Sequence, residues 1–217
     1  ISSMIDVLKH RGPDDQGYYT DDSIVLGMTR LSIIDLSQAA HQPMSNSDKS
    51  VWIVYNGEIY NHIQIRQKLE SKGYVYQSKS DTETVLHAYE EYGEDCINHF
   101  RGMYSIAIWD ARHHKLFLAV DRLGIKPLYY TQVENKFIFG SEIKAILQHP
   151  EVKREIDFIS MDEYLRYSYV PAPRTIFKGI KRLSPACYLT VKGTQIEAQS
   201  YWDLHFKPNY SRSESEW

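Results

Sequence analysis

The chain runs Tyr55-Asn56-Gly57-Glu58-Ile59-Tyr60-Asn61 at the point where a predicted strand meets a predicted helix. The residues before it, Val51–Tyr55, are rich in Val, Ile and aromatic side chains, which is typical of a strand. Asn-Gly is among the commonest turn dipeptides, so Asn56 and Gly57 predict a turn. They also allow a chemical interpretation. The side-chain amide of Asn56 and the unhindered N–H of Gly57 can point at one oxygen, as in an oxyanion hole.

Two helices are predicted after this stretch. Asn61 is a candidate cap for a helix through Leu69, and Gly73 lies where such a helix would stop. Ser80-Asp81-Thr82-Glu83 has the Ser-x-x-Glu pattern of a capping box and predicts a second helix that ends near Gly93.

Strands dominate the rest of the chain. Gly, Pro and Asp predict a loop over Arg11–Gly17, and apolar residues predict a strand within Ile24–Ile34. A β-meander is predicted from four further segments: Met103–Trp109, Leu116–Val120, Leu128–Thr131 and Phe137–Phe139. The remaining predicted elements are helices over Met4–Lys9, over Ser141–Gln148 and from a capping box at Ser160–Glu163, and strands over Tyr188–Val191 and Gln195–Trp202. Strand pairs that alternate with helices predict sheets covered by helices.

Composition excludes several classes of protein. The 217 residues include 25 Lys and Arg against 28 Asp and Glu, a formal charge of −3, and no run of Lys and Arg predicts a nucleic-acid or anionic-membrane surface. No apolar run approaches the about 20 residues that cross a bilayer, so we expect a soluble, cytoplasmic protein. Cys96 and Cys187 lack metal-site spacing, His113 and His114 lack ligand spacing, and no phosphate-binding glycine loop occurs.

Five sequence blocks together resemble a known family. They resemble, in order, the glutaminase domain of glutamine-dependent asparagine synthetases, which are class II glutamine amidotransferases. The similarity spans nearly the whole chain, in the blocks Arg11–Asp14, Arg30–Asp35, Tyr55–Asn61, Ser80–Glu83 and Asp121–Tyr130.

The resemblance implies both a fold and an activity. The implied fold is α+β, a four-layer αββα N-terminal-nucleophile (Ntn) hydrolase sandwich of antiparallel sheets flanked by helices. The implied activity is hydrolysis of L-glutamine to glutamate, with the ammonia used for ATP-dependent amidation of aspartate in asparagine biosynthesis. Two alternatives stay open: an amidotransferase acting on a sugar or peptide carboxylate, and a non-catalytic Ntn-like binding module.

The resemblance also implies roles for individual residues. Arg30 would bind the α-carboxylate of glutamine, for which a guanidinium offers parallel donors. Asp81, helped by Glu58, would bind the α-ammonium, while Asn56 and Gly57 would stabilise the tetrahedral oxyanion. The backbone of the segment after Arg30 would line the pocket, and its residues are Leu31, Ser32, Ile33 and Ile34.

One required residue has no counterpart in the sequence. The nucleophile of the family is an N-terminal Cys whose own amine is the base, whereas position 1 is Ile1 and neither Cys96 nor Cys187 matches. We expect the family's Cys-Gly-Ile segment upstream of Ile1, and residues 1–217 alone to be inactive.

The expected organisation is an amidotransferase domain over 1–205 and a linker over 206–217 towards a synthetase domain. No cofactor or metal is expected in this chain, whereas ATP and Mg are expected in the synthetase domain. The expected partners are L-glutamine and that domain, with no nucleic acid and no membrane, and the sequence leaves a homodimer open.

Overall fold

The computed structural model of the protein describes residues 1–208, 210, 211, 213 and 215. Within them, no helix is long and apolar enough to span a membrane. The predicted linker over 206–217 includes positions 209, 212, 214, 216 and 217, which lie outside the described residues. The α-helices are α1 (Ser2–Asp6), α2 (His62–Ser71), α3 (Asp81–Tyr92), α4 (Cys96–His99), α5 (Ile143–Ile146) and α6 (Phe158–Tyr167). Short 3₁₀ turns cover Lys9–Arg11, Gln38–Ala40 and Gly93–Asp95.

Among the residues that the structure describes, the strands form three antiparallel sheets. The largest has the order β11-β10-β6-β5-β4-β3, the second is the hairpin β1-β2, and the third has the order β8-β7-β9. The strands are β1 (Asp15–Thr20), β2 (Val25–Arg30), β3 (Met44–Ser45), β4 (Val51–Ile59), β5 (Gly102–Asp110), β6 (Lys115–Val120), β7 (Tyr129–Val133), β8 (Lys136–Gly140), β9 (Lys181–Arg182), β10 (Cys187–Lys192) and β11 (Gln195–Ser200).

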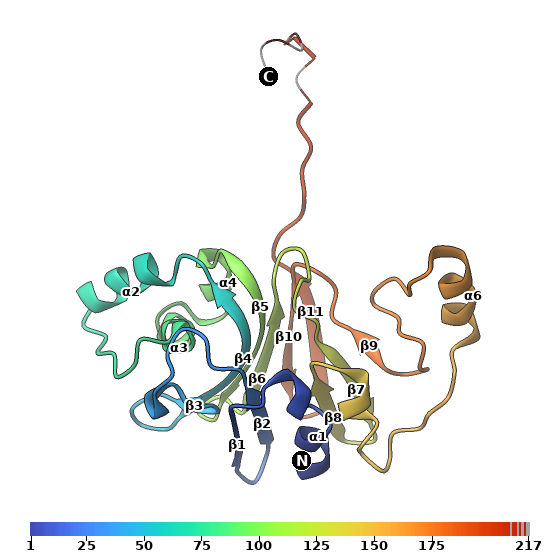
Figure 1. The fold of residues 1–217 in the computed structure, drawn as a ribbon, viewed down its shortest axis with the longest axis horizontal. Coiled ribbons are helices and arrows are strands. Elements are labelled where there is room, and N and C mark those ends of the chain that lie inside the picture. The colour runs from blue at the N-terminus through green and yellow to red at the C-terminus, as the bar shows by residue number, and fades with distance from the viewer. Residues whose placement is uncertain (209, 212, 214, 216–217) are drawn as a thin grey trace.

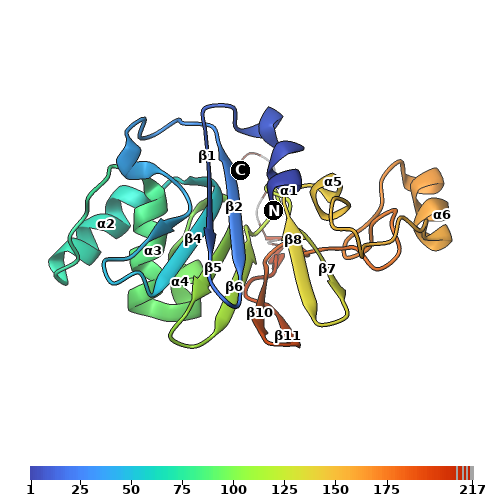
Figure 2. The ribbon, with the colours of Figure 1, turned by 90° about the horizontal axis from the view of Figure 1, so that it is seen from below.

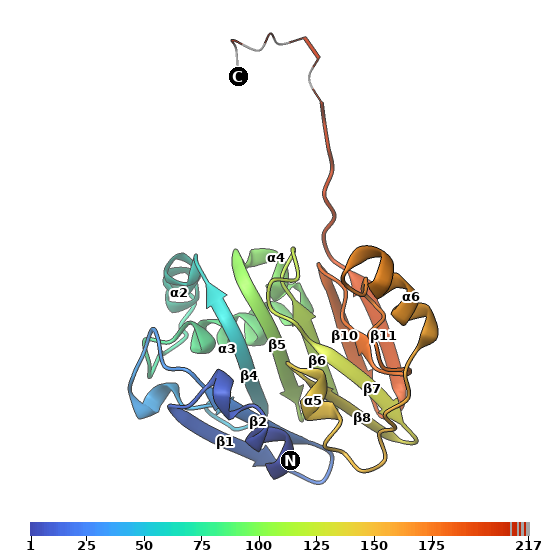
Figure 3. The ribbon, with the colours of Figure 1, turned by 45° about the vertical axis from the view of Figure 1, so that its right-hand side comes forward.

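These elements stack in layers. Helices α2, α3 and α4 cover one face of the six-stranded sheet (Figure 1), and the hairpins β1-β2 and β7-β8 lie against its other face (Figure 3). Helix α1 contacts both β2 and α5, and α5 contacts β8, so these two helices lie on the second sheet layer (Figure 2). The α+β sandwich of antiparallel sheets flanked by helices is thereby confirmed.

Strand alternation divides the core into two main clusters. In β4, Ile53, Tyr55 and Ile59 join the cluster beneath the helices, whereas Val54 joins the cluster between the sheet layers. This follows from the period of two along a strand. Asn56 and Glu58 share the parity of Val54, so their side chains face the space between the two sheet layers.

Several local predictions were wrong. Asn56 and Gly57 are not in a turn, because β4 continues through them and pairs with β5 as far as Ile59. The loop predicted over Arg11–Gly17 ends early, since β1 begins at Asp15, and the strand predicted to Ile34 ends at Arg30.

The predicted β-meander is two hairpins in different sheets, β5-β6 and β7-β8. Helix α5 spans Ile143–Ile146 and is shorter than the helix predicted over Ser141–Gln148. Helix α6 begins before the predicted box at Ser160, because the Asp157 side chain accepts a hydrogen bond from the Ile159 N–H.

Candidate functional site

A cavity of about 1270 Å³ brings the separate sequence blocks together. Part of its lining comes from β2, from β4, from the segment after β2 and from the start of α3. The predicted site residues in its wall are Arg30, Leu31, Ile33, Ile34, Asn56, Gly57, Glu58 and Asp81. Ser32 is not among the lining residues, and its N–H donates to the Asp14 carboxylate at 2.8 Å.

The block Arg11–Asp14 supports the end of β2. A Cβ added to Gly12 would lie 2.4 Å from the Arg30 nitrogen, so only glycine allows this approach. The Asp14 N–H donates to the Arg30 carbonyl at 3.1 Å. This sequence block therefore fixes the backbone on both sides of Arg30, whose side chain is only 9% exposed.

Arg30 is further oriented by its own segment. Its Nη2 donates to the main-chain carbonyl of Asp35. The intervening residues are not held by burial, since Leu31 is 55% and Ile33 71% exposed. The guanidinium thus enters the cavity wall from a strand end, followed by a loop fixed mainly by polar contacts.

Asp81 lies at the first turn of α3, where Ser80 caps the helix by accepting from the Thr82 N–H. The residue is 4% exposed, and its carboxylate accepts from the Tyr55 hydroxyl at 2.7 Å and the Ile59 N–H at 3.0 Å. Within the described part of the chain, both hydrogen bonds end on Oδ2, which leaves Oδ1 for another donor. Burial, and then the Asp81 charge, raise the pKa of Tyr55 well above its ordinary value, so its hydroxyl stays a donor.

The backbone of β4 presents its amides alternately to the two sides of the strand. The Tyr55 N–H donates to the Gln42 side chain at 2.7 Å and the Ile59 N–H donates to Asp81. Gly57, at the midpoint, has the same parity, so its N–H points to the same side. Because the short strand β3 pairs only with residues 52 and 53, Gly57 lies beyond its reach.

The partner of Gly57 across the ladder confirms this direction. Gly57 is in register with Tyr104 of β5, whose N–H and carbonyl both bond to Asp121 on the far side. Both groups of one residue point to one side of an antiparallel strand, so Tyr104 does not exchange hydrogen bonds with Gly57. The absence of a side chain also matters, since a Cβ on Gly57 would lie 2.1 Å from the Met103 carbonyl oxygen.

The Asn56 side chain has an unusual property for a buried amide. Among the described residues, its Nδ2 is buried without a hydrogen-bond partner. A buried donor without an acceptor costs about 1–3 kcal/mol. Together, the Nδ2 of Asn56 and the N–H of Gly57 are two donors at the cavity wall, an arrangement suited to an oxygen that gains negative charge.

Neither cysteine takes part in the cavity. Across the described residues that line it, no thiol occurs. Cys96 lies in the cluster beneath the helices, and Cys187 packs against the cluster between the sheets. Burial raises the pKa of both thiols. Since the thiolate is the nucleophile, neither residue is suited to attack a ligand here.

Three residues that organise the site were not predicted from the sequence. Gln42 bridges β4 and α3 by accepting from the Tyr55 N–H and donating to Thr82 Oγ1. Tyr55 itself orients Asp81, and Asp35 holds Arg30. Tyr55 and Asp35 lie in the blocks Tyr55–Asn61 and Arg30–Asp35 that resemble the family, and this was the one sign in the sequence that they belong to the site. Gln42 lies outside them and only its place before Pro43 marked it as part of a loop.

Residues 1–202 match the family described as "Glutamine amidotransferase domain". The chain therefore belongs to this family. It is 40% identical, over 207 residues, to "Asparagine synthetase [glutamine-hydrolyzing] 3" of Bacillus subtilis (strain 168), covering 94% of this chain and 34% of that protein. It is also 39% identical to "Amidase chyE" of Penicillium rubens, covering 100% of this chain and 32% of that protein. The chain thus spans about a third of the length of these relatives.

A solved structure shows the same fold at low sequence identity. The glutamine phosphoribosylpyrophosphate amidotransferase from B. subtilis matches with a TM-score of 0.66 and 16% identity, over 92% of this chain and 46% of that chain. The resemblance to class II amidotransferases and their Ntn-hydrolase fold is confirmed.

Proposed function

We propose that residues 1–205 bind L-glutamine in the cavity, and that the full-length protein hydrolyses it to glutamate and ammonia. The ammonia then amidates aspartate in an ATP-dependent step. The family membership and the similarity to glutamine-hydrolysing asparagine synthetases support this proposal. The observation that carries it is the presence of a cation, a carboxylate and two amide donors in one cavity wall: Arg30, Asp81, Asn56 and Gly57.

Each group would recognise a different part of glutamine. The Arg30 guanidinium matches the α-carboxylate, to which it can donate two hydrogen bonds. The open Oδ1 of Asp81 would accept from the α-ammonium, and Glu58 adds a second negative charge in the same wall. The side-chain amide would then extend towards Asn56 and Gly57.

Hydrolysis through this arrangement follows acyl-transfer chemistry. A thiolate adds to the carbon of the side-chain amide, and the carbonyl oxygen becomes an oxyanion that accepts from Asn56 Nδ2 and the Gly57 N–H. The carbon–nitrogen bond then breaks and the nitrogen leaves as ammonia after taking a proton. Water hydrolyses the resulting thioester, which releases glutamate and restores the thiol.

We infer that the nucleophile lies outside residues 1–217. Cys96 and Cys187 are the two cysteines of the sequence; Cys96 is buried, Cys187 is half-buried, and their positions outside the cavity lining support this inference. The resemblance assigns the role to an N-terminal Cys. Residues 1–217 alone would accordingly release no ammonia from glutamine.

The remaining parts of the proposal concern the full-length protein. Residues 206–217 would link this domain to a synthetase domain that binds ATP and Mg²⁺, and a homodimer would be detected by the mass of the protein in solution. A second candidate acceptor is a carboxylate other than that of aspartate, because one similar protein, "Amidase chyE", does not carry the name of an asparagine synthetase. Amidation assays with aspartate and with other carboxylates separate the two.

Arg30→Ala in the full-length protein tests the proposed binding mode. Removing the cation should raise the KM for glutamine at least about 100-fold, because a buried charge-assisted pair is lost. Synthesis from added ammonia should survive, since the synthetase site lies elsewhere. The measurement is product formation with either nitrogen source.

Arg112→Ala is the matched control, because Arg112, whose side chain is exposed, pairs with the buried Asp110 and does not line the cavity. We expect its KM for glutamine to stay at the wild-type value. A wild-type KM in Arg30→Ala would refute the assignment of Arg30. Absence of glutamine hydrolysis in the full-length wild type would refute the proposed function.

A further inference from the structure

Asp35 connects the two segments that present Arg30 and Asp81 to the cavity. Its Oδ2 accepts from the Lys79 N–H at 2.8 Å, two residues before Asp81. Its Oδ1 accepts from the Ser37 N–H at 2.8 Å, and its main-chain carbonyl accepts from Arg30 Nη2. One residue therefore contacts the guanidinium of one segment and the backbone of the other.

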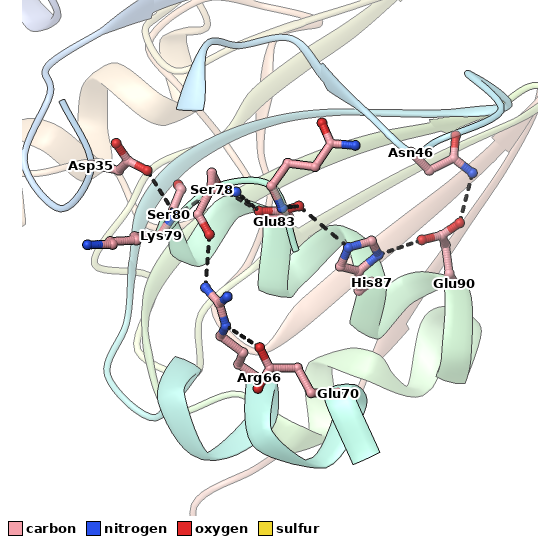
Figure 4. A network of polar contacts seen from close by, with 11 residues as sticks. Asp35, Asn46, Arg66, Glu70, Ser78, Lys79, Ser80, Glu83, His87 and Glu90 are labelled. Atoms are coloured by element: carbon pink, nitrogen blue, oxygen red, sulfur yellow. Dashed lines mark hydrogen bonds and ion pairs between the residues drawn. The ribbon is translucent and has the colours of Figure 1, made fainter. Parts of the chain in front are cut away.

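The position of the Lys79 N–H is well defined, because hydrogen bonds to Glu83 and Arg66 hold the loop that contains it. The two carboxylate oxygens of Glu83 accept from the N–H groups of Gln77 and Ser78, each at 2.7 Å. The Ser78 carbonyl accepts from Arg66 Nη1 at 2.9 Å. Figure 4 shows Asp35 reaching this anchored loop beside Lys79 and Ser80.

The segment from Arg30 to Asp35, on the other side of this contact, is held by few interactions of its own. Leu31 and Ile33 are exposed, so apolar burial does not hold the residues between Arg30 and Asp35. The contact between the Ser32 N–H and Asp14 fixes the start of this segment. The Asp35 carboxylate fixes its end against the loop that precedes α3. Hydrogen bonds from Ser37 and Lys79 lower the pKa of Asp35, which keeps the carboxylate ionised at neutral pH.

We propose that Asp35 is a positioning residue for glutamine binding. Asp35 sets the separation and orientation of the Arg30 guanidinium relative to the Asp81 carboxylate. This inference rests on the proposed function, in which these two groups bind the α-carboxylate and the α-ammonium of the same glutamine. A substrate with both charges needs both partners at one fixed spacing. Loss of the Asp35 carboxylate would let the Arg30 segment move away from α3 while leaving the donors on β4 in place.

Asp35→Ala in the full-length protein is the main test. We expect the KM for glutamine in ammonia release to rise about tenfold or more, because charge-assisted hydrogen bonds to two amides are lost. The kcat at saturating glutamine should stay within about threefold, since Asn56 and Gly57 are untouched. Synthesis from added ammonia should be unchanged. Asp35→Asn keeps one acceptor oxygen out of two, so its KM should lie between those of wild type and Asp35→Ala.

Asp48→Ala is the matched control. Asp48 makes the same kind of local bond, accepting from the Ser50 N–H at 3.0 Å, but on the turn before β4 and away from the cavity lining. Its KM should equal that of wild type. Thermal unfolding of each variant identifies any folding defect, and Asp35→Asn provides the test if Asp35→Ala does not fold.

The outcomes separate this inference from the proposed function. If the wild type hydrolyses glutamine and both Asp35 variants keep a wild-type KM, the positioning role is wrong and the proposed function stands. An equal fall of kcat with glutamine and with ammonia would show a merely structural role and would also overturn the inference. If the wild type does not hydrolyse glutamine, the proposed function fails and this inference fails with it.

Discussion

In the proposed mechanism, Asn56 combines a cost to folding with a benefit to catalysis. Its Nδ2 is buried without a partner among the described residues, although it lies in the middle of a regular strand. A donor that folding leaves unsatisfied is already oriented and desolvated when a negatively charged oxygen arrives. The electrostatic benefit then appears in the transition state rather than in the free protein.

Asn56→Ala should lower the kcat for glutamine hydrolysis by about 10²–10³, the usual effect of losing one oxyanion donor. The KM should change little, because binding of the two α-substituents is retained. The free energy of unfolding should not fall by more than about 1 kcal/mol, since no hydrogen bond of Nδ2 is lost. Steady-state kinetics and denaturant unfolding of the full-length protein give both quantities.

Asn46→Ala serves as the control, because the Asn46 amide, unlike that of Asn56, has hydrogen-bond partners that hold the fold. The Asn46 side chain accepts from the Val51 N–H at 3.0 Å and donates to Glu90 at 2.8 Å. This variant should lose stability, by about 2 kcal/mol, but keep the kcat of the folded fraction. A normal kcat in Asn56→Ala would remove Asn56 from the proposed mechanism.

At the scale of an element, α3 depends on a buried charged histidine. His87 Nδ1 lies 2.8 Å from Glu90, and its Nε2 lies 3.7 Å from Glu83, which also anchors the loop before α3. Burial alone would lower the pKa of His87, but Glu83 and Glu90 outweigh this effect and raise the pKa to about 9. The imidazolium is therefore part of the folded helix at neutral pH.

Because its pKa rises on folding, His87 stabilises the fold fully below about pH 6.5, its ordinary value, and loses this contribution as pH rises through about 9. His87→Gln should destabilise this domain by about 3 kcal/mol at pH 6, where the buried Glu83 and the half-buried Glu90 lose their cation. The difference from wild type should shrink towards pH 9. Urea unfolding at several pH values measures it, and a difference that is constant from pH 6 to 9 would contradict this account.

The elements that could be predicted from sequence are those with local end signals. Ser80 caps α3 as expected and Gly93, with φ of 60°, ends it. The Glu83 half of the capping box differs, because its carboxylate bonds to Gln77 and Ser78 rather than to the Ser80 N–H. For α2, Asn61 precedes the helix as predicted, but its side chain contacts His99 and Arg101 instead of capping it.

The failures at Asn56–Gly57 and at the predicted β-meander came from contacts between segments distant in sequence. Asn56 and Gly57 have the local signal of a turn, but pairing with β5 along the whole of β4 overrides it. The hairpins β5-β6 and β7-β8 have similar patterns, and their separation into two sheets depends on which neighbours they pair with: β10 for β6 and β9 for β7. No local pattern contains that information.

The candidate site could be predicted only in part from the sequence. Its proposed binding residues lie in the sequence blocks that suggested the family, and the structure brings all of them except Ser32 to one cavity wall. Their roles stay predictions. The supporting contacts of Gln42, Tyr55 and Asp35 could not be predicted, since each joins two elements that meet only in the folded protein.

At the scale of the whole molecule, the cavity lies where the layers of the sandwich meet. The polar part with the proposed binding residues is formed by the end of β2, the middle of β4 and the start of α3, and the rest of the lining includes apolar residues such as Leu116, Leu128 and Val191. A volume of about 1270 Å³ exceeds the roughly 300–1,000 Å³ common for small-molecule sites. Glutamine would therefore occupy only the polar part.

The proposed function requires that this polar part binds an α-amino acid in one orientation. The most direct test is a crystal structure of the full-length protein with L-glutamate, the expected product. We predict its α-carboxylate on Arg30, its α-ammonium on Asp81, and its side-chain carboxylate within hydrogen-bond distance of Asn56 Nδ2 and the Gly57 N–H. Glutamate bound outside this cavity, or bound with its side-chain carboxylate on Arg30, would contradict the account.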